Sequence, residues 1–127
     1  MKQKLIAYRG EKFTLEWYFD SRGKSNASEY YHQLTEEERD KIFYLFKLLG
    51  NMGKIFNKQK FRDEDDQIYA FKSDQNRLLC FFFHGAKVVI TNGFQKKQDK
   101  LPPREKKRAV KAKEDYIKRN RGGNYYD

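Results

Sequence analysis

Residues 68–116 decide the fold, and they read IYAFKSDQNRLLCFFFHGAKVVITNGFQKKQDKLPPREKKRAVKAKEDY. Three short apolar runs are separated by turn-forming residues, and aromatic and β-branched side chains dominate the runs. We therefore expect strands over 68–72, 77–83 and 87–94. The middle run is almost wholly apolar, which is typical of a strand that lies centrally in a sheet.

A strand and two helices are expected before this stretch. Residues 13–19, FTLEWYF, alternate apolar and polar side chains with the period of a half-buried strand. Ser25 can cap a helix over 27–33, and Thr35 with Glu38 forms the capping box of a second helix. The second helix would carry an apolar stripe facing the sheet and would end at glycine. The stripe consists of Ile42, Leu45, Phe46 and Leu49, and the glycines are Gly50 and Gly53.

A basic helix is expected after the last strand. Pro102 and Pro103 would begin it, because proline is favoured in the first turn of a helix. Ala109, Ala112 and Tyr116 would form its apolar face, with its lysines pointing outward. The predicted fold is α+β. An N-terminal strand and a helical hairpin pack on a mainly antiparallel sheet of about four strands, with the basic helix at the C-terminal end.

The length predicts one domain with a single core. We expect this domain to span residues 1–127, with its core over about 13–117. Residues 118–127 contain paired glycines and no apolar period, so we expect a flexible tail there. Residues 1–10 would form either a short strand or a mobile terminus.

Positive charge is concentrated toward the C-terminal end. Lys and Arg outnumber Asp and Glu by 28 to 18, and residues 95–127 hold +7 of the net charge of +10. Localised positive charge favours a polyanionic partner or an acidic protein partner. A merely solvated basic surface is the alternative.

The residue types in the chain also indicate where in the cell the protein is expected and whether it needs a metal or cofactor. One cysteine, Cys80, excludes an internal disulfide and suits a reducing cytoplasm. No apolar run approaches the length of a membrane span, so we expect a cytoplasmic protein without membrane contact. Cys80, His32 and His84 show no metal-ligand spacing, and we expect neither a metal nor a cofactor. Residues 63–66, DEDD, are more typical of an acidic loop, solvated or paired with lysines, than of a cation site.

Several short motifs occur in a fixed order along the chain. They are GKSNASEYYHQL at 23–34, IYAFK at 68–72, RLLCFFF at 77–83 and GFQKK at 93–97, followed by a proline step and a basic helix with EDY at 114–116. This ordered set resembles the RelE/ParE superfamily of bacterial type II toxins, and within it the HigB-like, phage-derived branch. The resemblance covers about residues 13–117.

The resemblance implies a small α+β fold and a cognate antitoxin that wraps or masks the toxin. A helix-turn-helix protein would fit that partner role. In the RelE and HigB branches the activity is cleavage of messenger RNA in the ribosomal A site, with the ribosome and its mRNA as partners. We therefore expect a ribosome-dependent, metal-independent mRNA endonuclease (an mRNA interferase). The alternatives are a non-enzymatic, ParE-like inhibitor of DNA gyrase and an inactive phage-derived binding module.

Four basic residues are the expected catalytic residues. RNA cleavage by the 2′-hydroxyl builds negative charge on the phosphate, and fixed cations stabilise that charge. Arg77 begins the apolar strand just after a turn, and Lys72 ends the preceding strand across the same turn. Lys96 and Lys97 leave the last strand, where neighbouring side chains diverge, so we expect only one of the two to reach the site. Lys72, Arg77 and either Lys96 or Lys97 match basic positions of the relatives, although rim charges that keep a sheet edge soluble are the alternative interpretation.

The chain departs from the family pattern in two places. Ile68 and Ala70 stand where RelE proper has lysines, and Leu101 and the prolines stand where it has a tyrosine. The general acid or base is therefore not identified by position. A lysine whose pKa is depressed by neighbouring cations is one hypothesis. The aromatic candidates for stacking on bases are Tyr125, Tyr126 and Tyr116, of which Tyr116 fits the core better.

A second set of lysines is expected to contact ribosomal RNA. Such contacts position a protein on phosphates without reading sequence, and they weaken as the salt concentration rises. These lysines lie after the helical hairpin and on the last helix: Lys54, Lys58, Lys60, Lys106, Lys107, Lys111 and Lys113.

Overall fold

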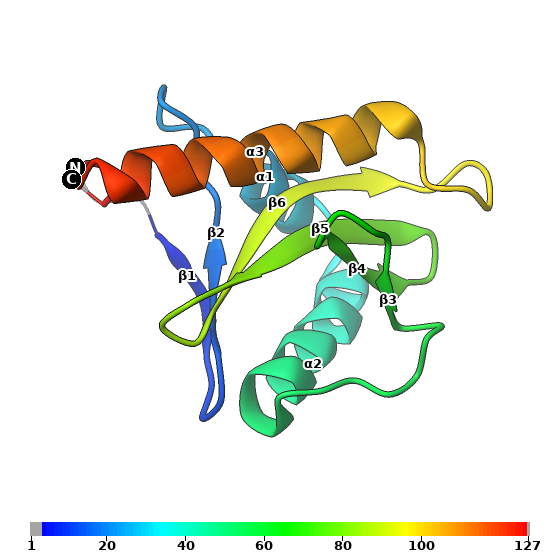
Figure 1. The fold of residues 1–127 in the computed structure, drawn as a ribbon. Helices are drawn as coiled ribbons and strands as arrows, with labels where there is room; N and C mark the ends of the chain where they lie inside the picture. Colours follow the sequence, from blue (N-terminus) through cyan, green and yellow to red (C-terminus); the bar gives the residue numbers. More distant parts are fainter. Residues whose placement is uncertain (1–3, 127) are drawn as a thin grey trace.

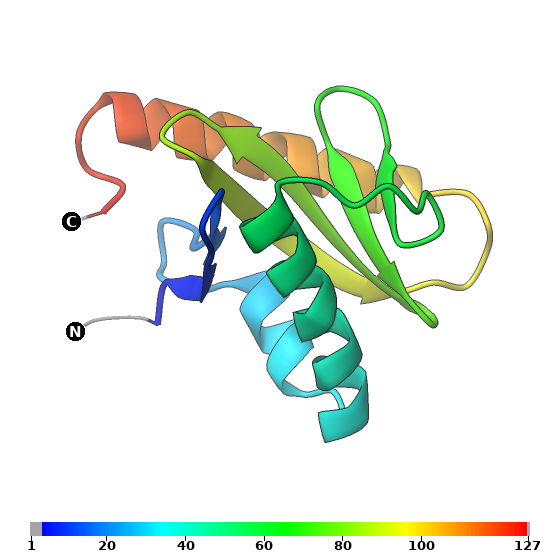
Figure 2. The ribbon, with the colours of Figure 1, turned by 90° about the horizontal axis from the view of Figure 1, so that it is seen from below.

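The computed structural model describes residues 4–126 and has a three-layer α+β architecture (Figure 1). A six-stranded sheet forms the middle layer, helices α1 and α2 cover one face, and helix α3 lies across the other (Figure 1, Figure 2). The expected α+β class is thus confirmed. In chain order the elements are β1 (Ile6–Arg9), β2 (Thr14–Trp17), α1 (Asn26–His32), α2 (Glu36–Met52), β3 (Phe61–Asp63), β4 (Tyr69–Ser73), β5 (Asn76–Phe83), β6 (Lys87–Gln95) and α3 (Pro103–Arg121).

The sheet has six strands, so the prediction of about four was wrong. Its order is β1-β2-β6-β5-β4-β3, and every neighbouring pair is antiparallel except β2 with β6. The additional strands are the edge strands β1 and β3, of four and three residues. Segments this short carry too little alternation to be distinguished from loops. The first three residues of the chain lie outside the described residues, so the N-terminal prediction is tested only from residue 4 onward.

Strands β5 and β6 form the centre of the molecule, because both of their faces are buried. On β5, Leu78 and Cys80 face helices α1 and α2, whereas Leu79 and Phe81 face α3. A strand that packs on both sides needs apolar residues at every position, which explains its continuous apolar sequence. Cys80 is fully buried, and burial raises the pKa of its thiol, so this cysteine acts as a packing residue.

The predicted capping signals of the helical hairpin are confirmed. The Ser25 side chain accepts a hydrogen bond from a backbone N–H in the first turn of α1. Thr35 and Glu38 form the capping box at the start of α2. Gly53 ends α2 with φ of +82°, a left-handed conformation that glycine adopts without steric cost.

Gly50 does not end helix α2, contrary to the prediction, but lies inside it. Its carbonyl accepts hydrogen bonds from the N–H groups of Lys12 (2.7 Å) and Phe13 (2.9 Å), which anchor the β1–β2 turn on the helix. A Cβ added to Gly10 would lie 2.3 Å from the Gly50 carbonyl carbon. These glycines therefore allow a close approach of two backbones.

The C-terminal residues are packed, where the sequence predicted a flexible tail. Helix α3 extends into this segment, and Tyr125 then joins the core on the α3 face of the sheet. The Tyr125 hydroxyl accepts a hydrogen bond from the Phe19 N–H at 3.0 Å. The Tyr126 hydroxyl donates to the buried Glu16 carboxylate at 2.7 Å. Aromatic packing on β2 thus outweighs the flexibility of the paired glycines, and only the last residue lies outside the described residues.

A β-bulge in β6 changes which residues face α3. Two successive residues of β5 pair with Asn92 and Ile90, so Thr91 is an extra residue without a partner in β5. Before the bulge Val89 faces α3, and after it Asn92 and Phe94 do. The bulge therefore shifts the in-and-out alternation by one residue for the rest of the strand.

None of the helices within residues 4–126 is both long enough and apolar enough to cross a lipid bilayer. The longest, α3, has 19 residues, and nine of them are Lys or Arg. Helices α1 and α2 have 7 and 17 residues.

Replacing Tyr125 with Ala should lower the free energy of unfolding by about 3 kcal/mol, because a buried aromatic ring is lost. Chemical denaturation followed by circular dichroism measures this change. Asn124→Ala, at an exposed neighbouring position, is the control and should change stability by less than about 0.5 kcal/mol. If the two variants had the same denaturation midpoint, the C-terminal segment would be a flexible tail as the sequence predicted.

Candidate functional site

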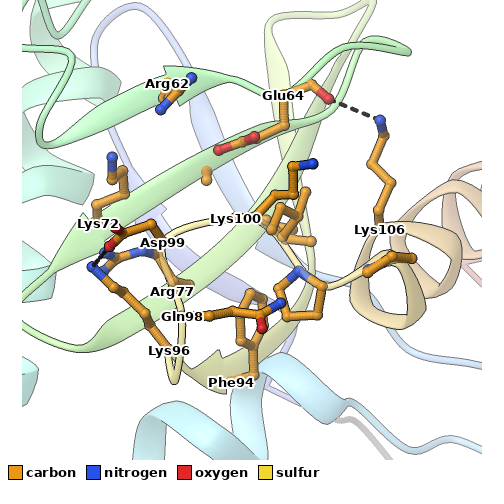
Figure 3. Close-up of a pocket in the computed structure, with 15 residues that line it drawn as sticks. Arg62, Glu64, Lys72, Arg77, Phe94, Lys96, Gln98, Asp99, Lys100 and Lys106 are labelled. Carbon is orange, nitrogen blue, oxygen red and sulfur yellow. Dashed lines mark hydrogen bonds and ion pairs between the residues drawn. The ribbon is translucent and has the colours of Figure 1, made fainter.

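A basic pocket opens on the α3 face of the sheet, beside the first turn of α3 (Figure 3). Its volume is about 330 Å³. Strands β3 to β6 form one side, and the segment between β6 and α3 forms the other. Ala70, Leu79 and Phe94 supply apolar lining. The charged lining consists of six basic and two acidic side chains: Arg62, Lys72, Arg77, Lys96, Lys100, Lys106, Glu64 and Asp99.

Strand pairing holds Lys72 and Arg77 side by side. They stand directly opposite each other in the β4–β5 ladder, as the sequence predicted. The guanidinium of Arg77 donates from Nη1 to the carbonyls of Asp74 (3.0 Å) and Asn76 (2.9 Å). Lys41 of α2 in turn lies 3.1 Å from the Asp74 carboxylate. The helical hairpin therefore fixes the turn that positions the arginine.

The bulge in β6 brings Lys96, and not Lys97, to the pocket. Lys96 continues the α3-facing alternation that Phe94 begins after the bulge, whereas Lys97 is exposed and does not line the pocket. The sequence predicts that one of these two lysines reaches the site but does not decide which one. The Lys96 Nζ lies 3.2 Å from the Asp99 carboxylate, whose side chain is fully exposed.

Lys106 brings the first turn of α3 into the pocket, although the sequence grouped it with surface lysines. Its Nζ donates to the Glu64 carbonyl at 2.8 Å and lies 3.1 Å from the Asp66 carboxylate. The fully buried Asn92 donates to the Glu105 carboxylate at 3.0 Å. This bond anchors the start of α3 on β6, and so places Lys106 above the sheet.

The acidic loop after β3 pairs with lysines of α3. Asp65, Asp66 and Gln67 have φ values of +73°, +56° and +64°. The left-handed conformation costs about 1–2 kcal/mol per residue, although Asp tolerates it better than most. Lys113 donates to the Gln67 side chain at 2.6 Å and helps to hold this loop. Within residues 4–126 no three His, Cys, Asp or Glu side chains come together as a metal site.

Burial and neighbouring cations lower the pKa of Lys72. Burial is the larger cause, and the charges of Arg77 and Arg62 add to it, whereas the Glu64 carboxylate opposes it. Burial also lowers the pKa of Arg77, which nevertheless stays charged because a guanidinium is so basic. An anion in the pocket would relieve the repulsion between these cations. The pocket is therefore suited to a phosphate group.

The other lysines predicted to bind RNA lie outside the pocket. Lys111 lines a second hollow of about 510 Å³ on the opposite side of α3, together with Arg22, Lys24 and Arg108. The rest occupy the α2–β3 loop and the outer surface of α3: Lys54, Lys58, Lys60, Lys107 and Lys113.

The tyrosines predicted to stack on bases do not line the pocket. Tyr116 is fully buried, as its core assignment predicted, and Tyr125 is nearly so. Tyr126 is partly exposed, but its hydroxyl is bonded to Glu16. His84 lies in the exposed β5–β6 turn, away from the pocket lining. Base stacking by these tyrosines is therefore not supported.

Sequence reasoning missed Arg62, Lys100, Glu64 and Asp99 as lining residues. Arg62 is on β3, an edge strand of three residues whose alternation is too short to detect. Glu64 stands in the acidic run 63–66, which the sequence predicts to be a loop. Lys100 and Asp99 lie in the irregular segment before α3, whose path the sequence does not determine.

A family model described as phage derived protein Gp49-like (DUF891) matches residues 29–114, about two-thirds of the chain. The matched segment runs from α1 into α3 and contains every charged residue of the pocket lining. A search of the curated proteins found no match. The chain therefore belongs to the Gp49-like family of phage-derived proteins, which is related to the RelE/ParE-type toxins.

Proposed function

We propose that this chain is a HigB-like toxin of a type II toxin–antitoxin system and that it cleaves messenger RNA bound to the ribosome. The family's relation to RelE/ParE-type toxins supports the toxin role. The observation that carries the nuclease activity is the basic pocket, in which side chains from four strands and one helix surround a space of phosphate size.

Different pocket residues would bind the phosphate and stabilise the transition state. Arg77 presents a planar guanidinium that can bind two phosphate oxygens at once. Lys72 and Lys96 flank it and would stabilise the negative charge that develops as the 2′-hydroxyl attacks. Because its pKa is lowered, Lys72 is also the lysine best suited to give a proton to the leaving 5′-oxygen.

Partners follow from this role. The ribosome and its mRNA supply the polyanion, and the surface lysines of α3 and of the α2–β3 loop would contact ribosomal RNA in the cytoplasm. A cognate antitoxin would neutralise the toxin, and a small helix-turn-helix protein encoded by the adjacent gene is the expected candidate.

Induction of the toxin, followed by mapping of ribosome-bound transcripts at nucleotide resolution, tests the activity. We expect new 5′ ends inside A-site codons. Arg77→Ala should reduce their number by about 100-fold, since it removes the main phosphate ligand. Intact transcripts accompanied by DNA damage would replace this proposal with gyrase inhibition.

Lys96 and Lys97 provide a matched pair of variants, because only Lys96 lines the pocket. Lys96→Ala should slow cleavage by about 10- to 100-fold, whereas Lys97→Ala should stay close to the wild type. Single-turnover cleavage on programmed ribosomes measures both rates. If a variant with both Lys96→Ala and Lys97→Ala cleaved at the wild-type rate, neither lysine would take part in the reaction.

RNA binding should weaken as the pH rises, and the loss should begin at a lower pH than for a lysine of ordinary pKa. The pKa of Lys72 is lowered in the free protein, so Lys72 loses its positive charge, and the pocket its attraction for phosphate, at a lower pH. In the Lys72→Arg variant the arginine stays charged over this pH range, so the variant should keep its affinity for RNA to a higher pH than the wild type. Fluorescence anisotropy with a labelled oligoribonucleotide measures both profiles, and profiles of identical shape would contradict this role of Lys72.

A further inference from the structure

The basic pocket contains one carboxylate that points inward. Glu64 follows β3, its side chain is partly buried, and it extends into the pocket between Arg62 and Lys100 (Figure 3). Its negative charge opposes the binding of a phosphate, since like charges repel strongly away from bulk water. A pocket that only bound phosphate would be better without it.

The charge of this carboxylate offsets part of the repulsion among the cations around it, but no direct contact holds it in place. The backbone of Glu64 makes the anchoring contacts: its N–H donates to the Ile68 carbonyl at 2.8 Å, and its carbonyl accepts from Lys106 at 2.8 Å. Within residues 4–126, the ion pairs of the pocket use other carboxylates, those of Asp66 and Asp99. The carboxylate of Glu64 itself makes no hydrogen bond or ion pair with the described residues.

The loop that follows Glu64 is held in one conformation. Residues 65–67 adopt the left-handed backbone conformation in succession, and contacts from Lys106 and Lys113 fasten them to α3. Strained backbone of this kind persists where the surrounding structure enforces it. The position from which the Glu64 side chain enters the pocket is therefore well determined, while its carboxylate is left free.

We propose that Glu64 is the general base of this pocket and that its substrate group is the 2′-hydroxyl of a ribonucleotide. The inference rests on the proposed function and deepens it, because it names the group that starts the reaction. Cations alone can bind and stabilise a phosphate, but a protonated lysine or arginine cannot accept the hydroxyl proton. Glu64 supplies the missing acceptor beside the phosphate site.

The reaction then proceeds without any further reactant. The Glu64 carboxylate takes the proton of the 2′-hydroxyl as the 2′-oxygen attacks the adjacent phosphorus and forms the new P–O bond. The bond from phosphorus to the 5′-oxygen breaks, and that oxygen takes a proton from the ammonium group of Lys72. The products are a 2′,3′-cyclic phosphate and a 5′-hydroxyl, and both side chains return to their starting protonation state by exchange with water.

Glu64→Gln and Glu36→Gln form a matched pair, because each replaces one carboxylate with an amide, and Glu36 is exposed on α2 outside the pocket lining. Ribosomes programmed with a labelled mRNA give the cleavage rate. The same mRNA with a 2′-O-methyl group at the cleaved nucleotide cannot react and gives the affinity. Thermal melting of each variant reports its folding.

Glu64→Gln should slow cleavage by about 100-fold or more while binding the methylated complex at least as tightly as the wild type. Glu36→Gln should cleave at a rate close to the wild type. Cleavage by Glu64→Gln within about threefold of the wild-type rate would overturn the assignment, because loss of a general base costs far more. Glu64→Asp retains the charge on a shorter side chain, so a comparable rate loss in that variant supports the role even if Glu64→Gln folds poorly.

The two levels of the proposal fail in different ways. If the wild-type protein leaves the mRNA intact on programmed ribosomes, both the nuclease function and the role of Glu64 are wrong. If the wild type cleaves and both carboxylate variants cleave equally well, the nuclease stands and only the role of Glu64 falls.

Discussion

The pairing of β5 with β6 is the constraint on which the rest of the structure depends. Because both faces of this pair are buried, each face needs its own helical cover. Helix α3 begins partway along its face, so the strand ends beyond its first turn remain open. On the α3 face of β5, the side chains change from apolar to basic at this point, from Leu79 to Arg77. The pocket is thus the part of the sheet that the helix leaves uncovered.

Grouping cations in this way opposes folding, and the fold compensates with rigid local supports. The Lys72–Arg77 pair stands on a two-strand ladder whose turn is held by α2. Lys106 is held by the loop after β3, and the start of α3 by Asn92. These supports hold the basic side chains at the edge of the pocket. Repulsion among these groups is retained where an anionic ligand can relieve it, a common compromise at functional sites.

Local signals made part of this structure predictable from the sequence. The capping box of α2, the proline start of α3 and the hairpin that pairs Lys72 with Arg77 each depend on residues close in the chain. Features that depend on distant contacts were missed. Edge strand β3 is defined by its partner strand, and the C-terminal tyrosines are ordered by contacts with β2 and the residues after it. Glu64 reaches the basic pocket from a loop whose path depends on contacts with α3.

The bulge at Thr91 has an evolutionary consequence. If the strand ran straight through Thr91 with every residue kept, regular alternation would turn Gln95 and Lys97 toward the pocket in place of Phe94 and Lys96. A relative that lost the bulge but kept its residue would therefore exchange one set of pocket side chains for another, whereas a relative that lost the residue as well would keep the same set. Alignments of this family that run through β6 without a gap would hide such a change, since they would equate residues on opposite faces of the sheet.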